Sequence, residues 1–163
     1  MADRLVLRMG IGYDSHRFAP GGPLVLGGVR ISSDVHLRGH SDGDAVAHAV
    51  TDAILGAAAQ GDIGALFSDT DSTNAGRDSI EMLTVAVARV RESGWLVGQV
   101  DVVVVAETPR IAPHRDEMRR RIAGAVGVEL AYVSIKGQTP ETMGLVGRGE
   151  GIACMATATI VRA

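Results

Sequence analysis

The chain has 163 residues, of which 46% are hydrophobic, so it can build one domain with one core and is too apolar for an intrinsically disordered protein. The net charge of −3 and the lack of a long basic run make nucleic acid a poor partner. One cysteine excludes an intrachain disulfide, and no apolar run reaches the roughly 18–20 residues that span a membrane, so we expect a cytoplasmic protein bound to neither nucleic acid nor membrane.

Hydrophobic periodicity predicts strands that alternate with helices. The segment 96–106 is apolar at nearly every position, which is typical of a strand covered on both faces. The segment 61–77 is rich in Gly, Asp, Ser and Thr, and polar loops of that length are commonly functional. In chain order, we predict strands over 4–13 and 24–31, a helix over 44–59, the polar loop over 61–77, a helix over 78–92, a strand over 96–106, a helix over 113–126, a strand over 131–136, a loop with one helical turn over 138–148, and a closing strand over 149–161.

This order of elements predicts the α+β class, with a single domain over 1–163, a mixed β-sheet and helices packed on one face of it. A sheet that is apolar on both faces needs a second cover on the face without helices. A neighbouring subunit would provide that cover, so we expect a homo-oligomer.

Asp14 and His16 lie near the end of the first predicted strand, two residues apart. Residues i and i+2 of a strand point to the same side, so a carboxylate oxygen and an imidazole nitrogen can meet at one point. His48, on the predicted helix, is a candidate third ligand. Two histidines and one aspartate would leave the fourth tetrahedral position of a zinc ion open for catalysis. The alternative is that both histidines are surface or hydrogen-bonded side chains.

His48 stands four residues from both Asp44 and Asp52, so the three side chains form a stripe on one face of the helix. We expect a carboxylate of this stripe to hold the His48 ring in one tautomer, as carboxylates do for metal-bound histidines. The stripe therefore favours His48 as a ligand.

Polar side chains gather just before and just after this helix. Within 40–44, Ser41 or Asp42 could simply cap the helix, or the cluster could line a pocket in which the helix N-terminus attracts phosphate and His40 donates to an anionic oxygen. The acidic segment 62–71 is either a solvated loop or a holder of substrate hydroxyls.

Two clusters near the end of the chain also allow two interpretations. Glu141 follows Thr139 and Pro140, and it either lies in a capped turn or binds a hard cation such as Mg²⁺. Arg148 and Glu150 stand among glycines that permit close backbone approach. They form either a buried ion pair at a subunit contact or an anion site.

Together these clusters resemble the 2-C-methyl-D-erythritol 2,4-cyclodiphosphate synthase family of isoprenoid precursor synthesis. Each segment is a weak signal, but the ordered set covers nearly the whole chain and is highly specific. The resembling segments are 12–16, 40–44, His48, 61–64, 67–71, 106–113 and 147–151.

The resemblance implies a homotrimer whose sheets face the threefold axis and whose active site lies between neighbouring subunits. It implies conversion of 4-diphosphocytidyl-2-C-methyl-D-erythritol 2-phosphate to 2-C-methyl-D-erythritol 2,4-cyclodiphosphate with release of CMP. The substrate's own 2-phosphate would be the nucleophile, since a phosphate monoester with its second pKa near about 6 is mostly a dianion at pH 7. The alternatives are a metal-dependent phosphohydrolase and a non-catalytic nucleotide sensor.

The resemblance also implies roles for individual residues. His40 and Thr139 would stabilise the transition state. The implied metal ligands are Asp14, His16 and His48 for Zn²⁺ or another divalent transition metal, and Glu141 for Mg²⁺ or Mn²⁺. The implied substrate contacts are Asp14, Ser15, His16, His40, Ser41, Asp62, Ile63, Gly64, Phe67, Ser68, Asp69, Thr70, Asp71, Ala106, Pro109, Arg110, Ile111, Ala112, Gln138, Thr139, Pro140, Glu141, Leu145 and Arg148.

Some positions depart from the family pattern. Ser68 stands where proline is common, and Arg110 stands where lysine is common. Leu145 replaces a frequent aromatic residue that lines the central cavity between subunits. None of these departures touches the implied metal ligands.

Overall fold

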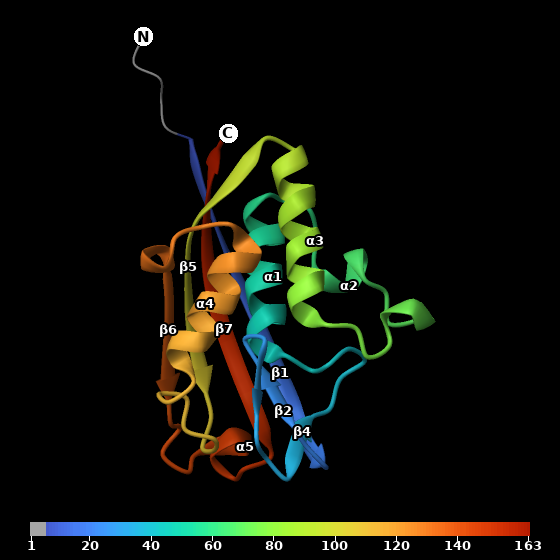
Figure 1. The fold of residues 1–163 in the computed structure, drawn as a ribbon, viewed down its shortest axis with the longest axis vertical. Coiled ribbons are helices and arrows are strands. Elements are labelled where there is room, and N and C mark those ends of the chain that lie inside the picture. The colour runs from blue at the N-terminus through green and yellow to red at the C-terminus, as the bar shows by residue number, and fades with distance from the viewer. Residues whose placement is uncertain (1–5) are drawn as a thin grey trace.

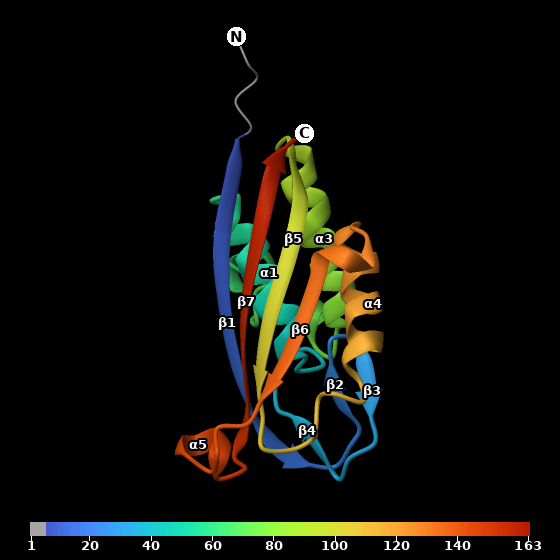
Figure 2. The ribbon, with the colours of Figure 1, turned by 90° about the vertical axis from the view of Figure 1, so that its left-hand side faces the viewer.

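A mixed five-stranded sheet forms the centre of the protein, whose residues 6–163 are described by a computed structural model. Neighbouring strands run antiparallel, except β5 and β6, which run parallel. In spatial order the strands are β4 (Val35–Leu37), β1 (Leu7–Pro20), β7 (Gly151–Arg162), β5 (Trp95–Val105) and β6 (Val133–Gln138). β1 and β6 therefore lie on opposite sides of the central pair β7 and β5 (Figure 2).

The longer helices all lie on one face of this sheet (Figure 1). They are α1 (Ala45–Ala57), α3 (Ser79–Glu92) and α4 (Arg115–Val126). The shorter elements are the hairpin of β2 (Leu24–Leu26) and β3 (Val29–Ile31), the helices α2 (Ile63–Leu66) and α5 (Gly144–Gly147), and 3₁₀ turns at Ser72–Asn74 and Leu130–Tyr132. The predicted α+β class, the mixed sheet and the one-sided helices are confirmed. No helix within residues 6–163 has both the length and the hydropathy to cross a membrane.

α1 packs backbone to backbone against β1. A Cβ atom on Gly10 would lie 2.1 Å from the carbonyl oxygen of Ala53, and one on Gly12 would lie 1.9 Å from that of Ala49. No side chain fits at such distances, so glycine alone permits the approach. The contact brings the face of α1 that carries His48 directly over the middle of β1.

The other face of the sheet is exposed in the single chain and mixed in character. It is apolar along β1, whereas Asp101 of β5 and Lys136 of β6 form an ion pair on it. On β5, Val100, Val102 and Val104 are fully buried beneath the helices. On β1 the alternation places large side chains on the opposite face, where they are 54–71% exposed: Leu7, Met9, Ile11 and Tyr13. An exposed apolar surface of this kind marks an interaction site.

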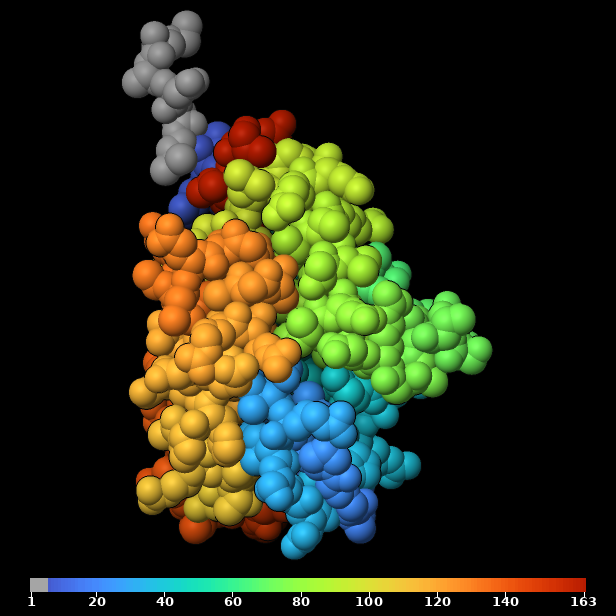
Figure 3. Space-filling view, viewed as in Figure 1, coloured from blue at the N-terminus to red at the C-terminus, as the bar shows by residue number. Residues whose placement is uncertain are grey.

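Four features differ from the sequence-based expectation. The predicted strand over 24–31 is wrong: Gly27 and Gly28, with φ of 56° and 73°, turn the chain, so the segment forms the hairpin of β2 and β3. β1 continues to Pro20, so Asp14 and His16 lie inside the strand rather than near its end; residues 4 and 5 of the predicted strand lie outside the described part. The three-residue β4 was not predicted, because its backbone pairing with β1 needs no apolar periodicity. The polar segment 61–77 contains α2 and a 3₁₀ turn, and it projects from the body (Figure 3).

Candidate metal and substrate site

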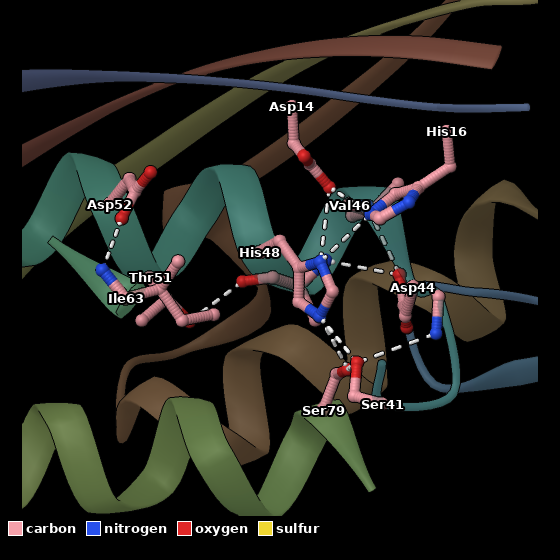
Figure 4. Close-up of polar contacts among 12 residues, drawn as sticks. Asp14, His16, Ser41, Asp44, Val46, His48, Thr51, Asp52, Ile63 and Ser79 are labelled. Carbon is pink, nitrogen blue, oxygen red and sulfur yellow. Dashed lines mark hydrogen bonds and ion pairs between the residues drawn. The ribbon is translucent and has the colours of Figure 1, made fainter. Parts of the chain in front are cut away.

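Three side chains with metal-binding atoms converge between β1 and α1 (Figure 4). Asp14 Oδ2 lies 2.8 Å from His16 Nε2 and 3.0 Å from His48 Nδ1, and the two nitrogens are 3.2 Å apart. The donor atoms around a tetrahedral zinc ion, with ligand distances of about 2.0–2.1 Å, are separated by about 3.3 Å. The expectation that these residues meet at one point is confirmed. We call Asp14, His16 and His48 the metal triad.

The electrostatics of the metal triad favour a bound cation. His16 Nδ1 lies 2.8 Å from the carbonyl oxygen of Arg38, which can only accept, so Nδ1 carries a proton and a neutral ring presents the Nε2 lone pair to Asp14. Burial, which would raise the pKa of Asp14, is outweighed by the hydrogen bonds and charges of His16 and His48, and that pKa falls to about 2. The hydrogen bond with Asp14 raises the pKa of His16 against the opposing effect of burial. The Nε2 lone pair of His16 and the Asp14 carboxylate oxygen, 2.8 Å apart, repel each other unless a proton or a metal ion lies between them.

Hydroxyl groups, and not carboxylates, contact the far side of the His48 ring. Its Nε2 lies 2.9 Å from Ser41 Oγ and 2.9 Å from Ser79 Oγ (Figure 4). Ser79 is the first residue of α3 and is fully buried. Sequence reasoning missed Ser79, because only the packing of α3 against α1 brings it to this ring.

The expectation that Asp44 or Asp52 holds His48 is wrong. The carboxylate of Asp44 caps α1 and also accepts hydrogen bonds from the backbone N–H groups of Gly27 and Gly28, at 2.8 and 2.6 Å. The carboxylate of Asp52 accepts one from the backbone N–H of Ile63 at 2.7 Å. In each case the carboxylate accepts from backbone N–H groups that have no partner within a helix or strand. Both aspartates therefore hold neighbouring segments against α1.

The metal triad opens into a hollow of about 230 Å³, here called the metal pocket. Its lining residues are Asp14, His16, His40, Ser41, His48, Ile63, Gly64, Phe67, Asp69, Asn74 and Met82. Asn74 and Met82 were not predicted. Asn74 is buried, and its side-chain amide donates to the carbonyl oxygen of Ser68 at 3.0 Å, so it shapes the projecting segment. A single buried asparagine in a polar loop leaves no periodic signal in a sequence.

A second hollow of about 520 Å³, here called the loop pocket, lies at the carboxyl ends of the parallel strands β5 and β6. Its lining residues are Ala106, Glu107, Pro109, Arg110, Ile111, Ala112, Arg115, Gly137, Gln138, Thr139 and Glu141. The carboxyl ends of parallel strands are common ligand sites. Glu107 lies within the segment 106–113 of the family resemblance, and it accepts a hydrogen bond from the Thr139 hydroxyl at 3.1 Å. Glu141 and Thr142 have left-handed backbone conformations, with φ of 53° and 64°, which in non-glycine residues are concentrated at functional sites.

The structure does not bring the two expected catalytic side chains together within one chain. His40 lines the metal pocket and Thr139 lines the loop pocket. The metal pocket is anchored on β1 and the loop pocket on β5 and β6, with β7 between them in the sheet. Each pocket therefore holds part of the expected machinery.

The other predicted contacts lie around these pockets. Ser15 points from β1 to the face opposite Asp14 and His16, because side chains alternate along a strand. Leu145 is 52% exposed on α5. Pro140 lies between Thr139 and Glu141, which both line the loop pocket. Arg148 forms an ion pair with Glu150 at 2.8 Å on the surface of the single chain. The buried ion pair at a subunit contact and the anion site both stay predictions.

Within the projecting segment, several predicted side chains hold the loop itself. The carboxylate of Asp62 caps α2 through Ala65, and that of Asp71 accepts from Thr73 at 2.9 Å. The hydroxyls of Ser68 and Thr70 contact each other at 2.7 Å. These contacts fix the loop in a defined shape beside the metal pocket.

Comparisons with known proteins agree along almost the entire chain. The chain is 57% identical over 157 residues to the 2-C-methyl-D-erythritol 2,4-cyclodiphosphate synthase of Gemmatimonas aurantiaca, covering 96% of this chain and 95% of that protein. It is 49% identical to an Escherichia coli protein of the same name, covering 96% and 99%. An IspF–CDP complex from Plasmodium falciparum superposes with a TM-score of 0.84 at 32% identity, covering 96% of each chain. The bifunctional IspDF of Campylobacter jejuni gives 0.95 at 37% identity, covering 98% of this chain and 43% of that one.

The YgbB family model matches residues 7–161. That range includes the metal triad and the residues that line both pockets. The chain belongs to the YgbB family.

Proposed function

We propose that this protein is a metal-dependent phosphorus–oxygen lyase, a 2-C-methyl-D-erythritol 2,4-cyclodiphosphate synthase of the non-mevalonate route to isoprenoid precursors. It converts 4-diphosphocytidyl-2-C-methyl-D-erythritol 2-phosphate to the 2,4-cyclodiphosphate and releases CMP. The named relatives support the reaction, and the convergence of the metal triad is the observation that carries it.

The donor sets suit two different cations. The two imidazoles and one carboxylate of the metal triad suit Zn²⁺ or another divalent transition metal and leave one position open for a phosphate oxygen. Within residues 6–163 no other cluster offers three such ligands. Glu141 would therefore contribute a single oxygen to Mg²⁺ or Mn²⁺. Substrate phosphates and water would supply the remaining ligands of that ion. When bound, these cations polarise the diphosphate oxygens.

The side chains of this protein hold the reacting groups together. His40 at the metal pocket and Thr139 at the loop pocket would donate hydrogen bonds to oxygens that gain charge as the substrate's 2-phosphate attacks. No side-chain nucleophile takes part. Holding both ends of one molecule in reach of each other can contribute on the order of 7 to 11 kcal/mol to lowering the barrier.

We propose that each active site is completed by two copies of the chain in a homotrimer. The cytidine end of the substrate would lie in the loop pocket of one copy, and the diphosphate would reach the metal pocket of the next. The support is the separation of the two pockets in the sheet and the exposed apolar face formed by Leu7, Met9, Ile11 and Tyr13, which a threefold assembly would cover. A cytoplasmic location stays a prediction.

Phosphorus NMR of the products tests the reaction. The purified protein is incubated with the substrate, Zn²⁺ and Mg²⁺, with a chelator-treated sample as control. We expect a cyclic diphosphate and CMP in equal amounts. Release of inorganic phosphate would instead identify a phosphohydrolase, and tight nucleotide binding without turnover would identify a sensor.

A further inference from the structure

We infer that Ser79 and Asp42 form a hydrogen-bonded relay that holds His48 in the tautomer and orientation needed by the metal, whereas Ser41 stays free to meet the substrate. The inference deepens the proposed function and rests on a metal bound by the metal triad. Ser79 and Asp42 are positioning residues, because both act through His48.

The relay starts at the ring nitrogen that faces away from the metal triad. His48 directs Nδ1 at Asp14 and His16, so a metal bound at Nδ1 leaves the ring proton on Nε2. That N–H needs an acceptor, and the hydroxyl oxygens of Ser41 and Ser79 lie at the same distance from it, 2.9 Å. Distance alone therefore does not decide which hydroxyl holds the ring.

The second partner of Ser79 decides it. The Ser79 hydroxyl donates to Asp42 Oδ1 at 2.5 Å, and its oxygen lone pairs are then available to accept from His48 Nε2. The carboxylate of Asp42 is itself fixed, because it accepts from the backbone N–H groups of Asp44 and Ser79, both at 3.1 Å. The direction of every hydrogen bond from the ring to the carboxylate is thus set, and a charged acceptor at the end strengthens the chain.

The Ser41 hydroxyl, unlike that of Ser79, is not held by a strong second hydrogen bond. Its hydroxyl lies 3.3 Å from Ser79 Oγ and accepts a long bond of 3.4 Å from the backbone N–H of Gly43. Within residues 6–163 it makes no hydrogen bond to a carboxylate. It is only half-buried and lines the metal pocket, whereas Ser79 is fully buried. The Ser41 hydroxyl can therefore turn to an anionic substrate oxygen without releasing His48.

The two serines give a matched pair for a zinc-binding test on the full-length protein. Zinc affinity is measured by competition with a chelator. We expect Ser79→Ala to weaken zinc binding by about 10- to 100-fold, the usual cost of losing an outer partner of a metal-bound histidine. Ser41→Ala should stay within about threefold of the unmodified protein, while Asp42→Asn, which does not touch the ring, should lose about tenfold.

A spectroscopic readout separates positioning from general destabilisation. In the zinc-loaded protein labelled with ¹⁵N-histidine, the Nε2–H proton of His48 should exchange slowly with water. It should stay slow in Ser41→Ala and in Ser79→Thr, which keeps the hydroxyl, and become fast in Ser79→Ala. Circular dichroism of the metal-free variants checks their folding. If Ser79→Ala does not fold, the zinc affinity of Asp42→Asn tests the relay instead.

Equal zinc affinity in Ser79→Ala and the unmodified protein would overturn the relay. A loss in Ser41→Ala as large as that in Ser79→Ala would overturn the division of roles between the two serines. If the unmodified protein binds no zinc, the proposed metal site itself fails, which is a separate result.

Discussion

The metal pocket and the loop pocket are built in opposite ways. The metal triad stands on regular elements, β1 and α1, and its donor atoms lie 2.8–3.2 Å apart in the single chain. The loop pocket is formed by segments that follow β5 and β6, where Thr139 and Glu141 are exposed. A metal centre tolerates errors of only about half an ångström in ligand position, so it needs a rigid scaffold, whereas loops can adapt to a larger ligand.

The largest effect should come from removing a ligand on the rigid side. His48→Ala leaves two donors, so we expect zinc binding to be lost and turnover to fall by at least about a thousandfold, since a Lewis acid supplies several kcal/mol of charge stabilisation. Metal analysis and product assays measure both, and circular dichroism should show an intact fold. Full activity in this variant would show that the metal site is misassigned.

Moving the scaffold should have a smaller effect than removing a ligand. In Gly12→Ala the new Cβ would lie 1.9 Å from the carbonyl oxygen of Ala49, so α1 must shift from β1. We expect a loss of about 1–3 kcal/mol in the free energy of unfolding, together with weaker zinc binding.

Gly124→Ala is the matched control for that change. Gly124 lies in α4 with no atom within 4 Å of an added Cβ, so alanine there should raise stability by about 0.5–1 kcal/mol. Denaturant unfolding compares the two variants. Equal stabilities would contradict the close approach of α1 and β1.

On the loop side, Glu141→Gln should lower the rate by about tenfold and raise the Mg²⁺ concentration needed, because a neutral amide binds a hard cation more weakly than a carboxylate. Zinc stoichiometry should not change, since Glu141 lies outside the metal triad. A Mg²⁺ dependence equal to that of the unmodified protein would remove Glu141 from the metal role.

The smallest effect concerns pH. The pKa of His16 is raised above 6.5 by its hydrogen bond with Asp14, and its proton must leave before Nε2 can bind a metal. Zinc affinity should therefore fall as the pH is lowered from about 8 to about 6.5, by less than about tenfold. Chelator competition across this range measures it, and an affinity that rises on acidification would contradict the role of His16.

The sequence predicted the positions of the metal triad, but not the hydrogen-bond partners of His48. The spacing of Asp14 and His16 placed both on one side of a strand, and helical periodicity placed His48 on α1. The predicted carboxylate partners of His48 were wrong, because backbone N–H groups of other segments donate to Asp44 and Asp52 instead. Those donors belong to the β2–β3 hairpin and to α2. Tertiary packing decides such contacts, and helical spacing does not reveal them.

On the loop side, the residues alone left Glu141 open between a capped turn and a cation site, and the role of Thr139 came from the resemblance. Thr139 and Glu141 carry no periodicity, and the left-handed backbone at Glu141 is not encoded by a glycine. The separation of His40 from Thr139 was equally invisible, because it depends on the strand order in the sheet.

Mixing two inactive variants tests the proposal that the two pockets act together across copies of the chain. His48→Ala disables the metal pocket and Thr139→Ala disables the loop pocket, so equal amounts of both are unfolded, mixed and refolded together. If each site joins the metal pocket of one copy to the loop pocket of the next, random assembly leaves about one quarter of the sites intact and recovers about a quarter of full activity. If each site lies within a single chain, the mixture stays as inactive as the two variants alone, and that result would rule out a site shared between copies.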